Sequence, residues 1–457
     1  MARANLARPV ALGLVLLFLA AEKTDAALFH ETMQDHFDGS NDARWQQEYF
    51  VNDTFWKGPE SGAPIFVCVG GEGPPLDESV TSASVHCNDA VEWLSETGAL
   101  FFALQHRYYG CQSNSSACPV AYPIESVRDM RFLSSRQALQ DLALFHDHMA
   151  KAYALTPANR WITFGGSYPG VLAGFARAKF PHLFFAAVSS SSPIFSRLEM
   201  PGYYNYVSRA FMEESVGGSK ACRDKIALGH ARIGDIFAAN ETAALRKLEA
   251  KFSLSSDSLD SLDARRDFAG VGVADFPAQA NDPTCTSPCC NIARICETML
   301  DADAHADPID ALAAVCTEFG FLQTCDKGSE CMFTQGLVTL DYMFSSSCAV
   351  YDFDDIKRTA AAIDRSNTIY GGYHIDTPRI LWIGGTVDPW LALSVQYLTR
   401  EQVRAGQRML LVKGASHHAW THPTRDDDQQ TVVDARTYLR HVLAGWLREG
   451  TQATAQA

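Results

Sequence analysis

The sequence is short of basic charge, of long apolar runs and of repeats. Its 457 residues carry 38 Lys and Arg against 53 Asp and Glu, a formal net charge of −15. Nucleic acids and anionic membranes attract basic surfaces, so neither is expected as a partner. Beyond the N-terminus no apolar run is long enough to cross a bilayer. The composition is otherwise that of an ordinary globular protein, and we expect no membrane span in the mature chain.

The one extended apolar stretch lies at the N-terminus. Arg3 and Arg8 precede the run PVALGLVLLFLAA, which is too short to span a bilayer comfortably and is followed by small residues. This pattern predicts a signal peptide over residues 1–26, with an uncleaved anchor as the alternative, and places the protein in the secretory pathway. Export makes three sequons candidate glycosylation sites: Asn52, Asn114 and Asn240.

Thirteen cysteines fit an exported chain, because disulfides persist in oxidising compartments. The number is odd, so at least one thiol is unpaired or pairs with another chain. Cys68, inside the apolar run IFVCVGG, is our candidate for a buried free thiol. Cys111 and Cys118 flank a short loop and could pair locally. Four further cysteines lie close together in the sequence: Cys285, Cys289, Cys290 and Cys296. Their spacing matches no zinc site, so we favour disulfides there and expect no metal or other cofactor.

Short apolar, β-rich runs alternate with helical patterns. Six strands are expected within Ala63–Pro74, Ala99–Gly110, Arg160–Tyr168, Leu183–Pro193, Arg379–Trp390 and Arg408–His418. Two helices are expected at Ser134–Ala154 and Pro169–Pro181. Near-continuous apolar strands are typical of a parallel sheet buried on both faces. The alternation therefore predicts an α/β fold.

Residues 200–375 break this alternation. The block is rich in helical patterns and holds nine of the thirteen cysteines. We interpret it as a mostly helical, disulfide-braced cap inserted between two strands of the sheet. The expected domains are then a first core part at 27–199, the cap at 200–375 and a second core part at 376–457.

The three residue types of a hydrolase triad each follow a predicted strand, in the chain order serine, aspartate, histidine. Ser167 follows WITF in the stretch WITFGGSYPG, Asp388 follows ILWIGGTV and His417 follows MLLVKGAS. In α/β-hydrolases the order is nucleophile, acid, histidine, each just after a strand. We therefore predict Ser167 as nucleophile, His417 as general base and Asp388 as the group that orients the base.

The turn at Ser167 is interpreted as a nucleophile elbow, the strand-to-helix turn G-x-S-x-G that presents a catalytic serine. It departs from that pattern because Pro169 occupies the last glycine position. Proline is tolerated there, since an N–H at a helix start has no intrahelical partner, and Gly170 could supply the close packing. The oxyanion hole is expected from the N–H groups of Tyr168 and Gly71, the latter in the loop GGEGP. In the same loop Glu72 either binds a substrate's free amino terminus or is a solvated loop carboxylate.

Several motifs together resemble the prolyl-carboxypeptidase family of serine peptidases, which includes dipeptidyl peptidase II and the thymus-specific serine protease. They are QDHFDG, GGEGP, HRYYG, GGSYPG, EFGFLQTC, DPW and SHH, spread over nearly the whole mature chain. EFGFLQTC looks most like the thymus-specific branch. The resemblance implies an α/β-hydrolase core with a helical cap, and cleavage of peptides after proline or small residues from one chain end. Such enzymes often act at acidic pH in lysosomes or endosomes, and homodimers are a family-based expectation.

The resemblance also implies roles for single residues. Ser167, Asp388 and His417 fall on the family's triad positions, and His417 is preferred over His418 because some members keep only the first histidine. Residues that would border the pocket for the residue before the cut bond are Tyr168, Val171 and Trp390. Two positions depart from the family: Gln105 stands where Glu is usual before HRYYG, and Pro169 where Gly or Ala is usual.

Three functions remain open from the sequence. The first is a secreted or lysosomal serine exopeptidase acting on peptide substrates, either as a dipeptidyl-peptidase or as a Pro-Xaa carboxypeptidase. The second is a secreted esterase or lipase with the same triad. The third is a binding protein that keeps the hydrolase fold without catalysis.

Overall fold

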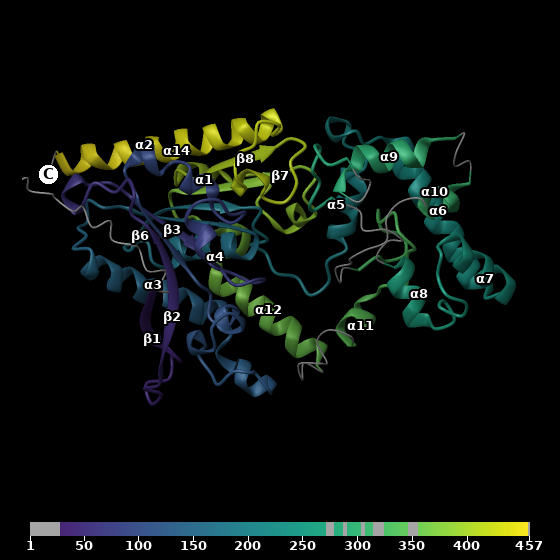
Figure 1. Cartoon of the computed structure of the whole chain (residues 1–457), viewed down its shortest axis with the longest axis horizontal. Helices are drawn as coiled ribbons and strands as arrows, with labels where there is room; N and C mark the ends of the chain where they lie inside the picture. The colour runs from purple at the N-terminus through teal and green to yellow at the C-terminus, as the bar shows by residue number, and fades with distance from the viewer. Residues whose placement is uncertain are drawn as a thin grey trace, which may run out of the picture.

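One eight-stranded sheet organises the chain (Figure 1), which the computed structural model describes over residues 28–270, 278–286, 290–302, 307–313, 324–345 and 355–455. The strands are β1 (Leu28–Met33), β2 (Arg44–Asn52), β3 (Ile65–Val69), β4 (Leu100–Leu104), β5 (Trp161–Gly166), β6 (Phe184–Ser190), β7 (Ile380–Gly385) and β8 (Arg408–Val412). Their order is β1-β2-β4-β3-β5-β6-β7-β8. β2 runs antiparallel to both of its neighbours, and β3 to β8 pair in parallel. This is the α/β-hydrolase fold, as predicted.

All six predicted strands are present, whereas β1 and β2 were not anticipated. β3 and β4 are buried along their whole length, which gives the continuous apolar runs that the sequence shows. β1 and β2 form an antiparallel pair at the sheet edge, and polar residues such as Glu31 and Gln46 stand opposite each other there. Such strands give no continuous apolar run, so the criterion that found the parallel strands misses them.

Helices cover both faces of the sheet. The helices of the sheet-bearing part are α1 (Asn88–Val91), α2 (Leu94–Thr97), α3 (Ser135–Ala152), α4 (Ser167–Lys179), α13 (Arg400–Arg404) and α14 (Gln430–Ala455). The side chains of α1, α2 and α14 share one apolar cluster with Phe66 of β3. Those of α3 and α4 share another with Ile65 and Val67, which point to the opposite face. No helix in the described part of the chain combines the length and apolarity needed to cross a membrane.

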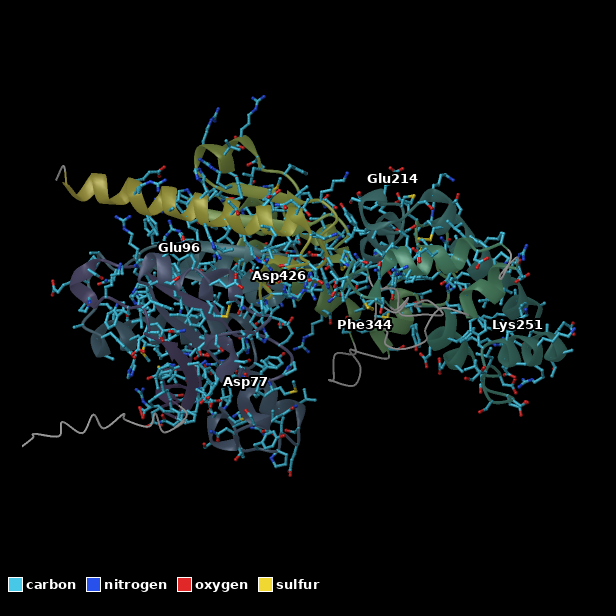
Figure 2. The ribbon with its side chains drawn as sticks, turned by 45° about the horizontal axis from the view of Figure 1, so that its top comes forward. Asp77, Glu96, Glu214, Lys251, Phe344 and Asp426 are labelled. Atoms are coloured by element: carbon cyan, nitrogen blue, oxygen red, sulfur yellow. A yellow bond between two sulfur atoms is a disulfide. The ribbon has the colours of Figure 1, made fainter. Side chains whose placement is uncertain are left out.

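A helical region is inserted between β6 and β7, and it extends beyond one end of the sheet (Figure 1). Its helices are α5 (Gly202–Ala210), α6 (Lys220–Ala239), α7 (Thr242–Lys251), α8 (Leu262–Ala269), α9 (Ile292–Leu300), α10 (Pro308–Ala313), α11 (Leu340–Met343) and α12 (Ile356–Tyr370). It has an apolar cluster of its own, which Val387 and Leu393 join from the second core part. In Figure 2, Glu214 and Lys251 lie in this region, and Asp77 and Glu96 lie in the sheet-bearing part. The domain limits at 199/200 and 375/376 stay predictions.

The cysteine assignments are partly confirmed and partly wrong. Cys111 pairs with Cys118, as expected. Cys68 is fully buried, but it is not free: it forms a disulfide with Cys87, just before α1. Cys68 points to the face of the sheet that the segment around α1 covers, and Cys87 lies in that segment. The two cysteines are 19 residues apart, so the apolar run around Cys68 gave no sign of its partner. Among the described residues of the helical region the pairs are Cys222–Cys296, Cys285–Cys290 and Cys325–Cys331.

Two of the four cysteines clustered in the sequence thus pair with each other, Cys285 with Cys290, and Cys296 pairs with Cys222. Among the described residues no group of three or more His, Cys, Asp or Glu side chains could hold a metal ion. Three predictions fall outside those residues, wholly or in part: the signal peptide at 1–26, Cys289, and all but the last two residues of EFGFLQTC.

Candidate active site

The predicted nucleophile lies on a sharp strand-to-helix turn. β5 ends at Gly166, and α4 begins at the very next residue, Ser167. Ser167 has φ +59°, a left-handed conformation that is strained for a residue with a side chain. A strained serine between a strand and a helix is the geometry of the nucleophile elbow.

Two glycines make this tight turn possible. A Cβ on Gly165 would lie 2.4 Å from the carbonyl oxygen of Pro169. A Cβ on Gly170 would lie 2.3 Å from Ser192 Oγ, beside β6. Gly170 therefore provides the close helix–strand packing proposed for it. Pro169 fits in the first turn of α4, where its missing N–H leaves no intrahelical bond unmade.

The predicted acid and base meet at the ends of neighbouring strands. Asp388 follows β7 and is fully buried, and its Oδ2 lies 2.9 Å from His417 Nδ1. Its other oxygen, Oδ1, accepts the N–H of Trp390 at 2.9 Å. The carboxylate thus fixes the ring orientation and places the proton on Nδ1. Within the described residues His417 Nε2 has no hydrogen-bond partner, so it is the nitrogen left to accept a proton.

His418 has a different, structural environment. Its N–H donates to Ser191 Oγ at 2.8 Å, and its Nδ1 lies 2.9 Å from Thr421 Oγ1. Burial, followed by the neighbouring His417, His422 and His86, holds the pKa of His418 well below its usual value. Asp388 contacts His417 and not this neighbour, and the choice of His417 as the base stays a prediction.

The elbow and the histidine loop lie against each other. β5, β6, β7 and β8 are consecutive in the sheet, so their carboxyl ends share one edge. A Cβ on Gly166 would lie 2.8 Å from the ring of His418. Ser167 and His417 are the sequence neighbours of these two residues, so the predicted nucleophile and base lie on facing segments.

Comparison with known proteins shows the family of the chain. Residues 32–315 and 311–439 match the serine carboxypeptidase S28 family. The chain belongs to this family. It is 29% identical to the human thymus-specific serine protease, over 92% of this chain and 86% of that protein. It is 27% identical to the bovine lysosomal Pro-X carboxypeptidase, over 91% of this chain and 86% of that protein.

Among solved structures, the proline iminopeptidase of Mycobacterium smegmatis matches over 87% of this chain and 97% of its own, with 13% identity and a TM-score of 0.36. We draw no conclusion from a similarity this slight, and the fold of the chain is assigned from its strand order.

In this S28 peptidase the loop after β3 packs on the elbow. A Cβ on Gly71 would lie 2.2 Å from Pro169 Cγ and 2.6 Å from Cδ, so only glycine fits against the proline ring. Gly71 therefore lies beside the first turn of α4, where the N–H of Tyr168 has no intrahelical partner. The two N–H groups predicted for the oxyanion hole belong to adjacent segments, and their role stays a prediction.

The motif HRYYG contacts the elbow through the side chain of Tyr168, the residue after Ser167. The sequence did not reveal this contact. His106 Nδ1 donates to the carbonyl of Arg107 at 2.7 Å, which leaves Nε2 to accept the Tyr168 hydroxyl at 3.1 Å. Burial lowers the pKa of His106 to about 4, so the ring is neutral near pH 5 to 7. Burial also raises the pKa of Tyr168 well above its usual value, and the phenol keeps its proton.

A buried ion pair lies beside His106 in the sequence. Arg107 binds Asp141 through two bonds of 2.6 and 2.7 Å, and His36 adds a third at 2.7 Å. Burial alone would raise the pKa of Asp141, but these bonds outweigh it and hold the pKa below its usual value. Gln105, the departure from the family pattern, is buried and accepts the N–H of Leu76 at 2.8 Å.

Of the three predicted pocket residues, Trp390 has the clearest placement. Its indole is half-buried, meets Tyr203 edge to face at 5.3 Å and lies 6.3 Å from the His417 ring. Val171 belongs to α4, and its side chain is buried in the apolar cluster that includes Ile65 and Val67 of β3. Its contact with substrate stays a prediction.

Glu72 lies in the loop after β3 and reaches solvent. Desolvation by the surrounding protein raises the pKa of its carboxyl, and the nearby His417 opposes this rise. The amine-binding role of Glu72 and its alternative, a solvated loop carboxylate, both stay predictions.

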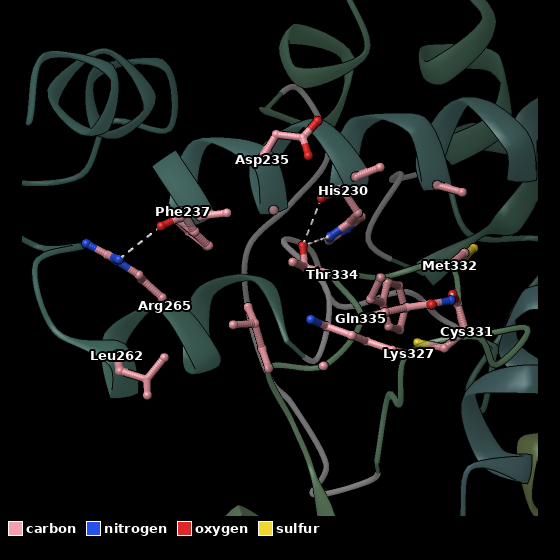
Figure 3. Close-up of a pocket in the computed structure, with 17 residues that line it drawn as sticks. His230, Asp235, Phe237, Leu262, Arg265, Lys327, Cys331, Met332, Thr334 and Gln335 are labelled. Atoms are coloured by element: carbon pink, nitrogen blue, oxygen red, sulfur yellow. Dashed lines mark hydrogen bonds between the residues drawn. The ribbon is translucent and has the colours of Figure 1, made fainter. Parts of the chain in front are cut away.

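A cavity of about 490 Å³ adjoins the base; its lining includes Asn281, Asp282, His417, His418 and His422. A second cavity of about 660 Å³ lies in the helical region and touches none of the predicted triad residues (Figure 3). Thr334 donates to the carbonyl of His230 there, and burial lowers the pKa of His230 to about 3. Position rather than size identifies the first cavity as part of the candidate active site.

The three sequon asparagines differ in exposure. Asn240 is exposed at the end of α6, where its Oδ1 accepts a bond from Arg265. Asn114 and Asn52 are half-buried, and the side-chain amide of Asn52 donates to the carbonyl of Thr81 at 2.8 Å. Glycosylation stays a prediction at all three.

Proposed function

We propose that the chain is a secretory-pathway or lysosomal serine exopeptidase that cleaves peptides after proline or small residues by an acyl-enzyme mechanism. Membership of a serine peptidase family supports the reaction class. The observation that carries the proposal is the buried Asp388–His417 pair, whose histidine lies on a loop packed against the strained Ser167 elbow.

Each residue then has one task. His417 Nε2 takes the proton of Ser167 as its Oγ attacks the carbonyl carbon of the peptide bond. The N–H groups of Tyr168 and Gly71 stabilise the resulting oxyanion. His417 next protonates the leaving amine, and water releases the acyl group by the same steps. The Asp388 carboxylate stabilises the imidazolium.

The aromatic wall suits a proline ring before the cut bond. Trp390, which packs against Tyr203, presents apolar ring surface close to His417, and proline has no N–H that would need a partner there. The Pro-X carboxypeptidase relative is named for cleavage at proline, which is consistent with this proposal.

We further propose release from the amino end, with Glu72 binding the free amine. Glu72 supplies a carboxylate near His417. Arg425, a basic residue at the adjoining cavity, is instead engaged by Asp282 through bonds of 3.1 and 3.2 Å. A carboxypeptidase would need such a basic group free for the substrate's carboxylate.

Matched substrates test the proposal. Xaa-Pro dipeptidyl substrates with free and acetylated amino termini, Pro-Xaa peptides and short-chain esters are assayed side by side. We expect turnover of the free-amine dipeptidyl substrate and loss of it on acetylation. Preferential turnover of Pro-Xaa peptides would replace the amino-end assignment, and turnover of esters alone would replace the peptidase assignment.

A further inference from the structure

A short segment of the helical region crosses the histidine loop. The carbonyl of Gln279 accepts the backbone N–H of His417 at 3.0 Å, and that of Asn281 accepts Ser416 Oγ at 3.0 Å. Asp282 pairs with both terminal nitrogens of Arg425. Three positions of one segment thus hold the loop that carries the predicted base.

The side chain of Gln279 extends this contact to the substrate pocket. Its Oε1 accepts the indole N–H of Trp390 at 3.1 Å and the hydroxyl of Tyr203 at 2.7 Å. Tyr203 belongs to α5, and Trp390 follows the predicted acid, Asp388, by two residues. A single residue therefore contacts the base by its backbone and both aromatic walls by its side chain.

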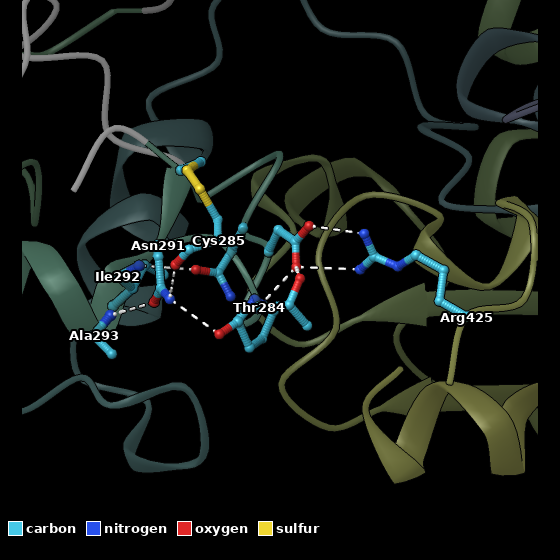
Figure 4. Close-up of a disulfide and its surroundings, with 10 residues drawn as sticks. Thr284, Cys285, Asn291, Ile292, Ala293 and Arg425 are labelled. Atoms are coloured by element: carbon cyan, nitrogen blue, oxygen red, sulfur yellow. Dashed lines mark hydrogen bonds and ion pairs between the residues drawn. A yellow bond between two sulfur atoms is a disulfide. The ribbon is translucent and has the colours of Figure 1, made fainter. Parts of the chain in front are cut away.

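The segment is itself held firmly. The amide of Asn291 donates to the carbonyls of Pro283 and Cys285, and the N–H of Ile292 donates to Asn281 Oδ1. These bonds join the segment to the start of α9, which the Cys222–Cys296 disulfide ties to α6. Figure 4 shows Arg425 reaching toward this segment from the core side, with Asn291 and Cys285 on the other.

Without Gln279 the position of Trp390 would depend on fewer bonds. Its indole is half-buried, its backbone N–H is bound to Asp388, and its ring meets Tyr203 only through an edge-to-face contact. An indole that loses its N–H acceptor in such a site pays the cost of an unpaired donor or turns toward solvent. Either change moves the wall of the pocket.

We propose that Gln279 is a positioning residue through which the helical region sets the pocket wall Trp390, and so the substrate preference, beside the base. The inference rests on the proposed function, because it takes His417 and Trp390 as parts of the active site. Gln279 touches no reacting atom and acts through Trp390.

Two substitutions at Gln279 test this inference. Gln279→Leu keeps the size and removes the acceptor of both bonds. We expect KM for the proline dipeptidyl substrate to rise about tenfold, from the loss of the bond that positions Trp390. We expect kcat and labelling of Ser167 by a fluorophosphonate probe to stay within a few-fold, since the backbone bond to His417 remains. Gln279→Glu keeps both acceptor bonds, so KM should stay near wild type. Its added negative charge should move the acid limb of the kcat/KM profile to higher pH.

Gln335→Leu is the matched control. Gln335 is another half-buried glutamine of the helical region, and it makes its three side-chain bonds to Gly328, Ser329 and Cys331, away from the candidate active site. We expect this variant to leave KM and the pH profile unchanged. An equal rise of KM in Gln335→Leu, or an unchanged KM in Gln279→Leu, would overturn the inference. Absence of probe labelling in the wild-type protein would instead overturn the proposed function.

Discussion

Replacing Gly71 by alanine should displace the loop after β3, whose Gly71 N–H is predicted to be an oxyanion donor. The new Cβ would lie 2.2 Å from Pro169 Cγ and 2.6 Å from Cδ. Carbon atoms in contact normally stay about 3.5–4 Å apart, so one of the two segments must move by more than about 1 Å. Pro169 is a ring fixed in the first turn of α4, and the loop is the side that yields.

Such a displacement is large on the scale of catalysis. An oxyanion donor works at about 2.7–3.1 Å from the developing charge, and loss of one donor costs about 10²–10³ in kcat. We therefore expect Gly71→Ala to lower kcat by that factor, about 3–4 kcal/mol, with KM little changed. Steady-state kinetics with a chromogenic proline dipeptidyl substrate measure both constants.

A second substitution checks the cause. Pro169→Ala removes the two atoms that the new methyl group meets, so Gly71→Ala/Pro169→Ala should recover much of the lost activity. Gly39→Ala serves as the control, because its Cβ would enter open space and its backbone is not left-handed. A Gly71→Ala enzyme within about threefold of wild type, or a double variant no better than the single one, would refute the reasoning.

Three further substitutions have definite expected outcomes. Asp388→Asn removes the carboxylate that fixes the His417 tautomer. We expect kcat to fall by about 10⁴ while circular dichroism shows an unchanged fold. A loss of kcat under about tenfold would contradict the assigned role. Glu72→Gln should raise KM for substrates with a free amino terminus and leave that for acetylated analogues unchanged; an equal effect on both would remove the amine-binding role. Asp89 is buried, one of its oxygens has no partner among the described residues, and burial raises its pKa to about 7. Since the unfolded carboxyl ionises near pH 4, the folded state loses stability as the pH rises from about 4 to 7. Asp89→Asn should therefore raise the Tm at pH 8 more than at pH 4.5, and equal shifts at both pH values would show that its charge is not the cause.

The parallel strands and the predicted triad could be read from the sequence, because the relevant signals are local. Each buried strand is a continuous apolar run, and each triad member directly follows one of these runs. The strained turn at Ser167 was signalled by the glycines on either side of it. Gly170 and Pro169 could be assigned by counting backbone donors in the first turn of a helix.

What the sequence could not reveal depends on contacts between distant segments. The Cys68–Cys87 disulfide requires knowing which face of β3 the following segment covers. His106 and Arg107 look like ordinary residues after a strand, and their roles arise from Tyr168 and Asp141, which lie 62 and 34 residues away. Gln279 has no motif at all, and its importance follows from three partners brought together by the helical region.

The most direct test of the proposed function is active-site labelling. The wild-type protein and Ser167→Ala are treated with a fluorophosphonate probe, and the modified residue is located by peptide mass spectrometry alongside a peptidase assay. We expect one label, on Ser167, with activity falling in proportion to labelling, and neither label nor turnover in Ser167→Ala. Peptide hydrolysis that survives in Ser167→Ala, or a label on a different serine of the wild-type protein, would contradict the serine peptidase mechanism built on this elbow.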